Sequence, residues 1–351
     1  MKILIIQNKR IGDVLISSLM ADNIKKNQPK AIVNFFCYDY ALPVIKDNPF
    51  IDHIISVSAA ELKKTSVLLK FCKQIRKENY DVIIDPYSKF QSRLMCLLSG
   101  ANITAGFIRK KKILSFKPYS LKVLYKKSSS LDCGKTIEDR MNLLCKAVPL
   151  KHISYEPKIY MDPSDSVYDS PSKPFFIVGI LGSVPSKSLP AATMAKVVDH
   201  ISKVYPDHLI IFNYAPHQRK EATIIYSLCK NKEAIDLNLY ESDLSKFLML
   251  LSKASALISN EGGSVHMAKA LNVPTFTIYS PFITKEHWNS FENLPIHQSI
   301  HLAEKRPDLY KNADRKRLKE IEKNPGLYYG ELTSDMIWSN LKSYLKNLIN
   351  T

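Results

Sequence analysis

Glycine is scarce in this 351-residue chain, which contains only 10 glycines. The dinucleotide-binding fingerprint GxGxxG does not occur, and this argues against a dinucleotide cofactor bound through that motif. The six cysteines are scattered singly, with no CxxC pair and no Cys/His cluster at zinc spacing. The sequence therefore predicts buried free thiols in a reducing compartment and no metal site.

Long apolar runs are also missing. The apolar run at residues 3–6 is interrupted by Lys9, Arg10 and Asp13, too early for a secretory signal peptide. No segment approaches the roughly 20 apolar residues that a membrane-spanning helix needs. We therefore expect a cytoplasmic protein, bound at most peripherally to the inner face of the cytoplasmic membrane.

Acidic residues are the minority charge, with 33 Asp and Glu against 50 Lys and Arg and a formal net charge of +17. Residues 101–130 contain no acid at all. Such a surplus favours anionic partners, either a lipid surface, a phosphorylated glycolipid or nucleic acid. No RNA-binding signature, zinc finger or recognition helix is present, so nucleic acid is not expected. The basic candidates for an anionic partner in this segment include Arg109, Lys110, Lys111 and Lys112.

Short β-rich runs alternate with amphipathic stretches along the whole chain, as in parallel sheets built from βαβ units. We expect strands at residues 2–7, 32–38, 54–57, 81–85, 103–107, 175–181, 208–214, 234–238, 256–260 and 275–280. Helices are expected near residues 13–26, 60–78, 89–99, 136–147, 191–202, 217–229, 242–254 and 264–271.

A polar, Pro- and Ser-rich stretch at residues 157–174 predicts a linker between two α/β domains. We expect an N-terminal domain over residues 1–165 and a C-terminal domain over residues 166–333. A last amphipathic helix, within residues 334–351, is expected to fold back onto the first domain. In open α/β domains, ligands bind at the carboxyl ends of the strands.

The turn after the first strand, residues 7–13, is the first candidate for chemistry. Gly12 permits a close approach of the backbone, and Asp13 falls in the first turn of the following helix. An acid there is either a charge that favours the helix dipole or a catalytic carboxylate in a cleft.

The second candidate is residues 257–268, an apolar strand that runs through a polar turn into an apolar helix. The N–H groups of residues 263–265 are suited to hold a diphosphate. His266 adds a donor near the same anion, and Glu261 can accept hydroxyl hydrogens from a sugar. A plain turn with a packed histidine fits the spacing equally well.

Two further strand-to-helix junctions carry polar residues. Residues 182–190 contain Lys187 in a serine-rich loop, where an ammonium group can meet phosphate as a point charge. Residues 213–218 end with Gln218, which either contacts a ribose or base or caps the helix.

Taken in this order, the segments resemble glycosyltransferase family 9, the ADP-heptose:lipopolysaccharide heptosyltransferases, across nearly the whole chain. The matching segments are Ile3-Leu4-Ile5-Ile6, Ile11-Gly12-Asp13-Val14-Leu15, Asn48-Pro49-Phe50-Ile51-Asp52, Ser259 to His266 with Ala268, Ala270-Leu271 and Val273-Pro274-Thr275, and Lys187 with Pro190.

The resemblance implies a GT-B type α/β fold, with two Rossmann-like domains facing a central cleft. It implies that the first domain binds the acceptor and the second the nucleotide sugar. Heptose would pass with inversion from ADP-heptose to the inner core of lipopolysaccharide, with Asp13 as general base. No metal or cofactor is implied, because side chains and backbone stabilise the departing ADP. The implied donor-binding residues are Lys187, Gln218, Glu261, Gly262, Gly263, Ser264 and His266; those for the acceptor are Lys9, Arg10, Arg109, Lys110, Lys111 and Lys112.

The chain departs from the family pattern at four positions. Glu261 and Gly262 stand where the family usually has Asp and Ser or Thr, Gln218 where many members have a glutamate, and Leu189 where tryptophan is usual. These changes leave open a different nucleotide sugar or acceptor on the same fold. A non-catalytic protein that binds anions through its basic face is the alternative from another class.

Overall fold

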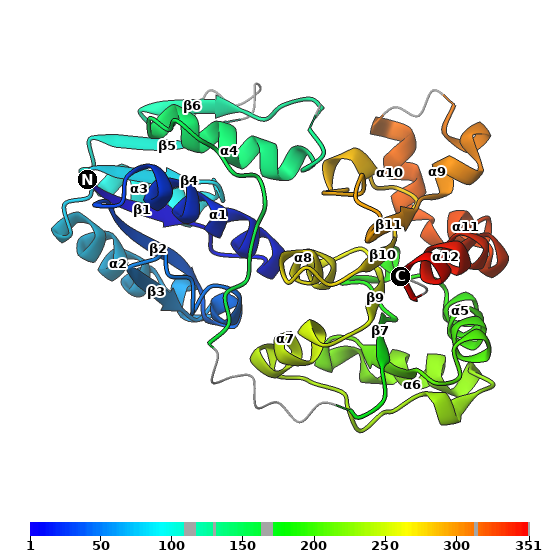
Figure 1. Cartoon of the computed structure of the whole chain (residues 1–351). Coiled ribbons are helices and arrows are strands. Elements are labelled where there is room, and N and C mark those ends of the chain that lie inside the picture. Colours follow the sequence, from blue (N-terminus) through cyan, green and yellow to red (C-terminus); the bar gives the residue numbers. More distant parts are fainter. Residues whose placement is uncertain (109–116, 129–130, 163–170, 312–314, 350–351) are drawn as a thin grey trace. The chain divides into compact units, whose positions relative to one another are not determined.

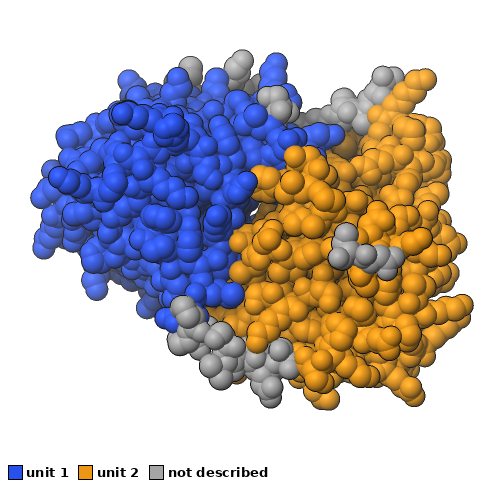
Figure 2. All heavy atoms as spheres, in the orientation of Figure 1, with its two compact units in different colours: residues 1–163, 286–290 blue, residues 164–285, 291–351 orange. Residues whose placement is uncertain are grey.

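The computed structural model describes residues 1–108, 117–128, 131–162, 171–311 and 315–349. The chain forms two compact units, each built around one parallel sheet (Figure 1). Unit 1 comprises Met1–Pro163 and Glu286–Ser290; unit 2 comprises Ser164–Lys285 and Phe291–Thr351 (Figure 2). The short segment 286–290 therefore belongs to unit 1 although it lies late in the sequence.

Unit 1 contains a six-stranded sheet in the order β3-β2-β1-β4-β5-β6 with every pairing parallel. This is the strand order of a dinucleotide-type Rossmann fold, and the order reverses between β1 and β4. Its strands are β1 (Lys2–Ile6), β2 (Ile32–Tyr38), β3 (His53–Val57), β4 (Val82–Asp85), β5 (Ile103–Ile108) and β6 (Leu121–Leu124). Its helices are α1 (Ile11–Asn27), α2 (Thr65–Lys77), α3 (Phe90–Leu98) and α4 (Lys135–Ala147).

Helices cover both faces of this sheet, and this explains why its central strands are apolar throughout. Leu4 and Ile6 of β1 pack in one cluster with residues of α2 and α3. Side chains alternate along a strand, so Ile3 and Ile5 point to the other face, where α1 and α4 contact each other and the sheet. With both faces buried, polar side chains are left to the carboxyl ends of the strands.

Unit 2 contains a five-stranded parallel sheet in the order β11-β10-β9-β7-β8. The order reverses between β7 and β9, as in flavodoxin-like folds. Its strands are β7 (Phe175–Gly179), β8 (Leu209–Asn213), β9 (Ala256–Asn260), β10 (Thr275–Ile278) and β11 (His297–Ile300). Its helices are α5 (Ala191–Val204), α6 (Arg219–Leu228), α7 (Leu244–Ser252), α8 (Gly263–Ala270), α9 (Leu302–Lys305), α10 (Arg315–Lys323), α11 (Pro325–Gly330) and α12 (Ser334–Ile349).

The C-terminal helix differs from the sequence-based expectation. Its apolar face, with Ile337, Leu341 and Tyr344, is buried in the main core cluster of unit 2. α12 contacts α5, β10 and β11, and the Tyr344 hydroxyl donates to the Ile296 carbonyl at 2.8 Å. The helix belongs to unit 2 rather than returning to the first domain, because its apolar stripe is buried in the core of unit 2.

One expected strand is wrong. Residues 234–238 were expected to pair, but Lys232–Ala234 form a 3-10 turn, and Ile235 makes only an isolated bridge to Ile210. β6 and β11 were not expected, because both are four-residue edge strands that contain polar residues.

Gly106 in β5 allows Tyr119 to lie flat against the sheet. A Cβ atom at this position would overlap the ring of Tyr119, and this ring is held by a hydrogen bond of 2.6 Å from its hydroxyl to Asp85. We expect Gly106→Ala to lower the free energy of unfolding by about 1–3 kcal/mol, as other overpacking substitutions do. Urea denaturation measures the change.

Gly326→Ala is the matched control, because nothing lies within 4 Å of a Cβ atom added in α11. It should leave the denaturation midpoint unchanged or slightly raised. Equal midpoints for Gly106→Ala and the wild-type protein would contradict the close packing of Tyr119 on β5.

Candidate functional site

The turn after β1 leads directly into α1 and presents Asp13. Gln7 is buried, and its side-chain amide donates to the Lys9 carbonyl. Ser17, one turn after Asp13 on α1, donates to the Gln7 side chain at 3.4 Å. The Asp13 side chain remains 25% exposed. The turn is thus tied to its own helix, and Asp13 stays accessible.

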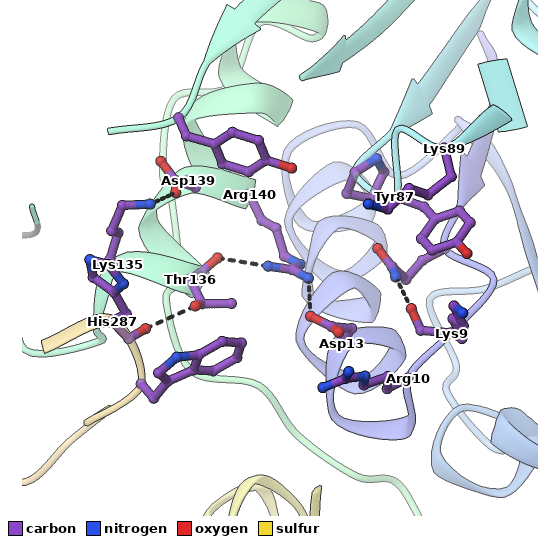
Figure 3. A pocket seen from close by; sticks show the side chains of 14 residues that line it. Lys9, Arg10, Asp13, Tyr87, Lys89, Lys135, Thr136, Asp139, Arg140 and His287 are labelled. Atoms are coloured by element: carbon purple, nitrogen blue, oxygen red, sulfur yellow. Dashed lines mark hydrogen bonds and ion pairs between the residues drawn. The ribbon is translucent and has the colours of Figure 1, made fainter. Parts of the chain in front are cut away.

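Asp13 lines a pocket of about 460 Å³ in unit 1 (Figure 3). The pocket lies where β1 and β4 end, which is the point at which the strand order reverses. Ligand sites of open α/β sheets are found at this position. The lining residues are Gln7, Lys9, Arg10, Asp13, Pro86, Tyr87, Lys89, Tyr125, Lys135, Thr136, Asp139, Arg140, His287 and Trp288.

Helix α4 supplies charged residues to the pocket. Lys135 and Asp139 form an ion pair of 2.5 Å along the helix. Arg140 reaches across to α1, where its Nη2 lies 2.5 Å from Oδ1 of Asp13 (Figure 3). Sequence reasoning missed all three residues, although they lie at the start of an expected helix. Nothing in the sequence indicates that this helix packs beside α1.

The turn after β4 brings Tyr87 and Lys89 to the pocket. Asp85 ends β4, is fully buried, and accepts from the Tyr119 hydroxyl at 2.6 Å and the Ser88 amide at 2.7 Å. Ser88 has a left-handed backbone with φ of 49°, and its hydroxyl accepts from the Phe107 amide at 2.8 Å. Burial raises the pKa of Asp85 to about 6, although the hydrogen bond from Tyr119 opposes it. Asp85 therefore fixes the backbone of this turn through the hydrogen bond that it accepts from the Ser88 amide.

The segment 286–290 completes the pocket with His287 and Trp288. The Thr136 hydroxyl donates to the His287 carbonyl at 2.8 Å. Burial, together with the nearby Lys135, lowers the pKa of His287, so its imidazole is mainly neutral at pH 7. Neither residue was singled out in the sequence, because the segment 286–290 lies more than a hundred residues away from the rest of unit 1.

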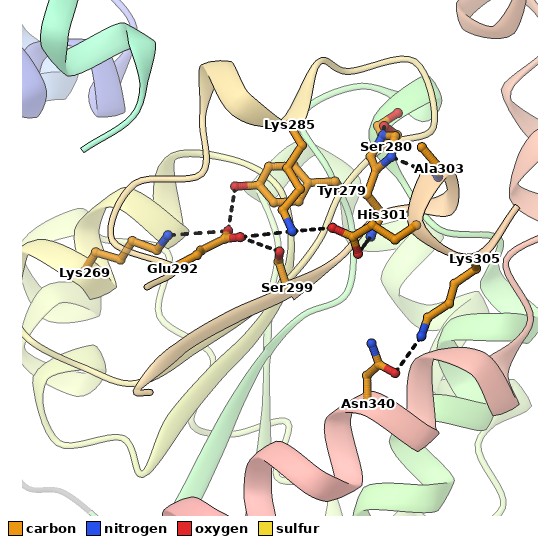
Figure 4. A network of polar contacts seen from close by, with 11 residues as sticks. Lys269, Tyr279, Ser280, Lys285, Glu292, Ser299, His301, Ala303, Lys305 and Asn340 are labelled. Carbon is orange, nitrogen blue, oxygen red and sulfur yellow. Dashed lines mark hydrogen bonds and ion pairs between the residues drawn. The ribbon is translucent and has the colours of Figure 1, made fainter. Parts of the chain in front are cut away.

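A polar network holds the two ends of this segment together (Figure 4). Lys285 precedes the segment and forms an ion pair of 3.2 Å with Glu292, which follows it. Glu292 also accepts from the Tyr279 hydroxyl at 3.1 Å and from the Ser299 hydroxyl at 2.7 Å. The ends are therefore fixed by contacts that do not involve the pocket itself.

A second groove of about 630 Å³ shares Lys9, Tyr87 and Lys89 with the pocket. It combines three lysine ammonium groups with apolar side chains and contains no acid. Its lining residues are Lys9, Lys63, Thr65, Leu68, Tyr87, Lys89, Phe90, Gln91 and Leu94. Phe90 is 72% exposed and contributes its apolar ring to this groove.

In unit 2, the residues expected to bind the donor gather at the carboxyl ends of β7, β8 and β9. Lys187 Nζ lies 3.1 Å from Glu261 Oε1. The Gln218 side-chain amide donates to the Gly182 carbonyl at 2.7 Å. Gly182 itself packs against the main chain of Lys187, where any larger residue would overlap the Lys187 carbonyl. Three turns that are distant in sequence thus meet at the point where the strand order reverses.

The loop that carries Lys187 is held by its main chain. The Leu189 amide donates to the buried Asn260 side chain at 2.9 Å, and the Ser280 hydroxyl donates to the Ser186 carbonyl at 2.7 Å. After the carboxyl end of β9, Gly262 leads into α8, whose first turn contains Gly263 and Ser264. His266 is half-buried in the next turn.

The expected site residues fall in two separate groups. Lys9, Arg10 and Asp13 line the pocket of unit 1, and the seven expected donor residues lie in unit 2. Arg109, Lys110, Lys111 and Lys112 lie outside the described residues. Among the residues that the structure describes, no group of three or more His, Cys, Asp or Glu side chains is arranged to hold a metal ion. Within the same ranges, no helix has the length and apolar character needed to span a bilayer.

Comparison with known proteins identifies the family. The family model described as glycosyltransferase family 9 (heptosyltransferase) matches residues 68–320. The chain belongs to this family. The protein is therefore a glycosyltransferase, and the expected family, class of enzyme and GT-B type α/β fold are confirmed.

Individual relatives are distant but span most of this glycosyltransferase. It is 22% identical to lipopolysaccharide heptosyltransferase 1 of Campylobacter coli, over 83% of this chain and 87% of the relative. It is 23% identical to lipopolysaccharide heptosyltransferase 2 of Escherichia coli K12, over 80% and 83%. A family 9 glycosyltransferase structure from Veillonella parvula has a TM-score of 0.79 at 14% identity, covering 100% of this chain and 98% of that one.

The structure of E. coli heptosyltransferase WaaC with ADP is also similar in fold. Its TM-score is 0.73 at 14% identity, with 98% of this chain and all of that chain covered. At such low identity, the agreement concerns the fold and not the ligand.

The buried carboxyl group of Asp85 predicts a pH-dependent stability of this glycosyltransferase. The folded protein holds the Asp85 proton up to a pKa of about 6, whereas the unfolded chain releases it near the ordinary aspartate value of about 4. Between these values the folded state binds more protons, so a rising pH favours unfolding. Relative to Asp85→Asn, the wild-type free energy of unfolding should fall by on the order of 2–3 kcal/mol between about pH 4 and 6.

Urea denaturation of both proteins at a series of pH values measures this difference. Asp207→Asn serves as the control because Asp207 lies in an exposed turn of unit 2. Its stability curve should run parallel to that of the wild-type protein across this range. A parallel curve for Asp85→Asn would contradict the buried, protonated carboxyl group.

Proposed function

We propose that this glycosyltransferase transfers heptose from ADP-heptose to the inner core of lipopolysaccharide, with inversion and with Asp13 as general base. The observation that carries the proposal is the accessible Asp13 carboxylate in a cation-rich pocket at the strand-order reversal of unit 1. The family and the names of its relatives, lipopolysaccharide heptosyltransferases 1 and 2, support the sugar and the acceptor.

The proposed reaction is a single displacement. The acceptor hydroxyl gives its proton to the Asp13 carboxylate, and its oxygen forms a bond to the anomeric carbon of heptose. The bond from that carbon to the β-phosphate oxygen breaks, and ADP leaves with the electron pair. The new glycosidic bond forms on the opposite face of the sugar, so the anomeric configuration inverts.

Charge on the departing ADP is stabilised by residues of unit 2 in this proposal. Lys187 supplies an ammonium group, and the first-turn N–H groups of α8 have no acceptor within the helix. The resulting field acts where negative charge develops and requires no metal ion. Support comes from the structure of E. coli heptosyltransferase WaaC, which contains ADP.

The acceptor is proposed to be a phosphorylated glycolipid at the inner face of the cytoplasmic membrane. The second groove of unit 1 supports this, because it joins three lysines with apolar residues next to the Asp13 pocket. An amphiphile with phosphate or carboxylate groups has the matching chemistry. Helix α2 adds four exposed cations and no acid on the same side of the sheet, namely Lys70, Lys73, Arg76 and Lys77.

A different nucleotide sugar is the second candidate, and two contacts favour it. Glu261 forms an ion pair with Lys187, and Gln218 donates to the Gly182 carbonyl. Both side chains differ from the usual family residues, and both have protein partners where a donor would bind. A donor other than ADP-heptose would account for these substitutions.

Nucleotide binding tests the donor. ADP should raise the melting temperature of the protein more than GDP, UDP or CMP, since a ligand that binds only the folded state stabilises it by mass action. Lys187→Met should weaken ADP binding by about 10- to 100-fold, because one charge-assisted contact is lost. Isothermal titration calorimetry gives the two dissociation constants.

Lys196→Met is the control for this measurement, because Lys196 is an exposed lysine on α5. It should bind ADP like the wild-type protein. A shift selective for UDP or GDP would replace ADP as the donor nucleotide. No shift with any nucleotide would favour the non-catalytic, anion-binding alternative.

Asp13→Asn tests the general base. The amide cannot accept the proton, so kcat for heptosyl transfer should fall by about 10²- to 10⁴-fold while ADP affinity remains unchanged. Transfer from ADP-heptose to a Kdo-lipid A acceptor is followed by mass spectrometry. Asp207→Asn should retain full activity, and an Asp13→Asn enzyme with wild-type kcat would exclude Asp13 as the base.

A further inference from the structure

Arg140 donates three hydrogen bonds, one of them to Asp13, the proposed base. Its Nη2 donates to Asp13 Oδ1 at 2.5 Å and its Nη1 to the Thr136 carbonyl at 3.0 Å (Figure 3). Its Nε donates to Ser17 Oγ at 2.9 Å. The side chain is only 10% exposed. A buried guanidinium with all three nitrogens engaged has little freedom to move.

The spacing of its partners explains how one side chain serves them. Asp13 and Ser17 are four residues apart on α1 and therefore lie on the same face of that helix. Thr136 lies four residues before Arg140 on α4, so its carbonyl is within reach of the guanidinium. α1 and α4 pack side by side in unit 1, and Arg140 crosses between them at the pocket.

The two oxygens of Asp13 differ in their surroundings. Oδ1 accepts the hydrogen bond from Arg140. Among the described residues, no protein hydrogen bond or ion pair reaches Oδ2. The carboxylate is thus held at one oxygen while the other remains available in the pocket.

We propose that Arg140 is a positioning residue that fixes the Asp13 carboxylate through Oδ1 and leaves Oδ2 to receive the proton of the acceptor hydroxyl. The proposal rests on the proposed function of Asp13 as general base. A base that is correctly oriented before the substrate binds avoids the loss of rate that a displacement of about 1 Å causes.

The position of Arg140 does not depend on Asp13 alone. Arg140 also carries its own hydrogen-bond partners, Ser17 and Thr136, so it remains held while Asp13 is briefly protonated.

Steady-state kinetics of Arg140→Met, Arg140→Lys and Arg140→Ala test the role. Arg140→Met should lower kcat by about 10- to 100-fold with little change in KM for the donor, because the base is misplaced and the donor residues are untouched. Arg140→Lys should recover part of kcat, since an ammonium group can pair with Asp13 but cannot hold Ser17 and Thr136 as well. Millimolar guanidinium should restore activity to Arg140→Ala.

Glu138→Gln is the matched control. Glu138 lies on the same helix, is buried and forms an ion pair with Lys126, but does not line the pocket. It should keep the wild-type kcat. If Arg140→Met keeps the wild-type kcat, or if its loss is not relieved by lysine or guanidinium, the positioning role is overturned.

A readout without turnover separates this proposal from the proposed function. The carboxyl ¹³C resonance of Asp13, assigned by its absence in Asp13→Asn, should move in Arg140→Met and stay in place in Glu138→Gln. An unmoved resonance in Arg140→Met overturns the inference even if the enzyme transfers heptose. If the resonance moves in Arg140→Met but the wild-type protein transfers no sugar, the contact is supported and the proposed function is rejected instead.

Discussion

Parallel pairing of strands around a buried, apolar centre in each sheet is the constraint on which the rest of this structure depends. Helices cover both faces of each sheet, so the central strands are mostly apolar along their length. Charged side chains from different strands can lie close together, outside the buried core, at the carboxyl ends of the strands. Asp13 after β1 and Lys187 after β7 both follow from this rule, as does the location of each group where the strand order reverses.

In each unit, a carboxylate at such a turn is paired with a cation from another element. Asp13 meets Arg140 of α4, and Glu261 after β9 meets Lys187 after β7. Each pair is partly buried. Removing one partner would therefore leave the other charge without compensation. The pairs differ in one respect: the Arg140 guanidinium also donates to Ser17 and to the Thr136 carbonyl, whereas the Lys187 ammonium group pairs with Glu261. The first pair therefore suits a fixed orientation, and the second suits exchange of one partner for a phosphate.

The sequence alone predicted the turns because each combines a strand end, a helix start and a polar motif within about ten residues. It could not predict Arg140 or Trp288, whose roles depend on contacts with residues more than a hundred positions away. The same reason explains the error for α12, since an amphipathic stripe indicates that a helix packs but not against which sheet. Residues 234–238 were misjudged because a short apolar run carries no information about whether a neighbouring strand is within reach.

Asp85 shows why these long-range contacts matter for the pocket. Its carboxyl group does not line the pocket, yet it holds the turn that brings Tyr87 and Lys89 there. The carboxyl group that holds this turn is buried. Its burial raises the pKa of Asp85 to about 6 and so favours the protonated form below that pH. Tyr119 and Ser88 offset part of this cost by donating to the carboxyl group. One wall of the pocket of unit 1 is thus held in place by a group that lies inside the sheet and not in the pocket.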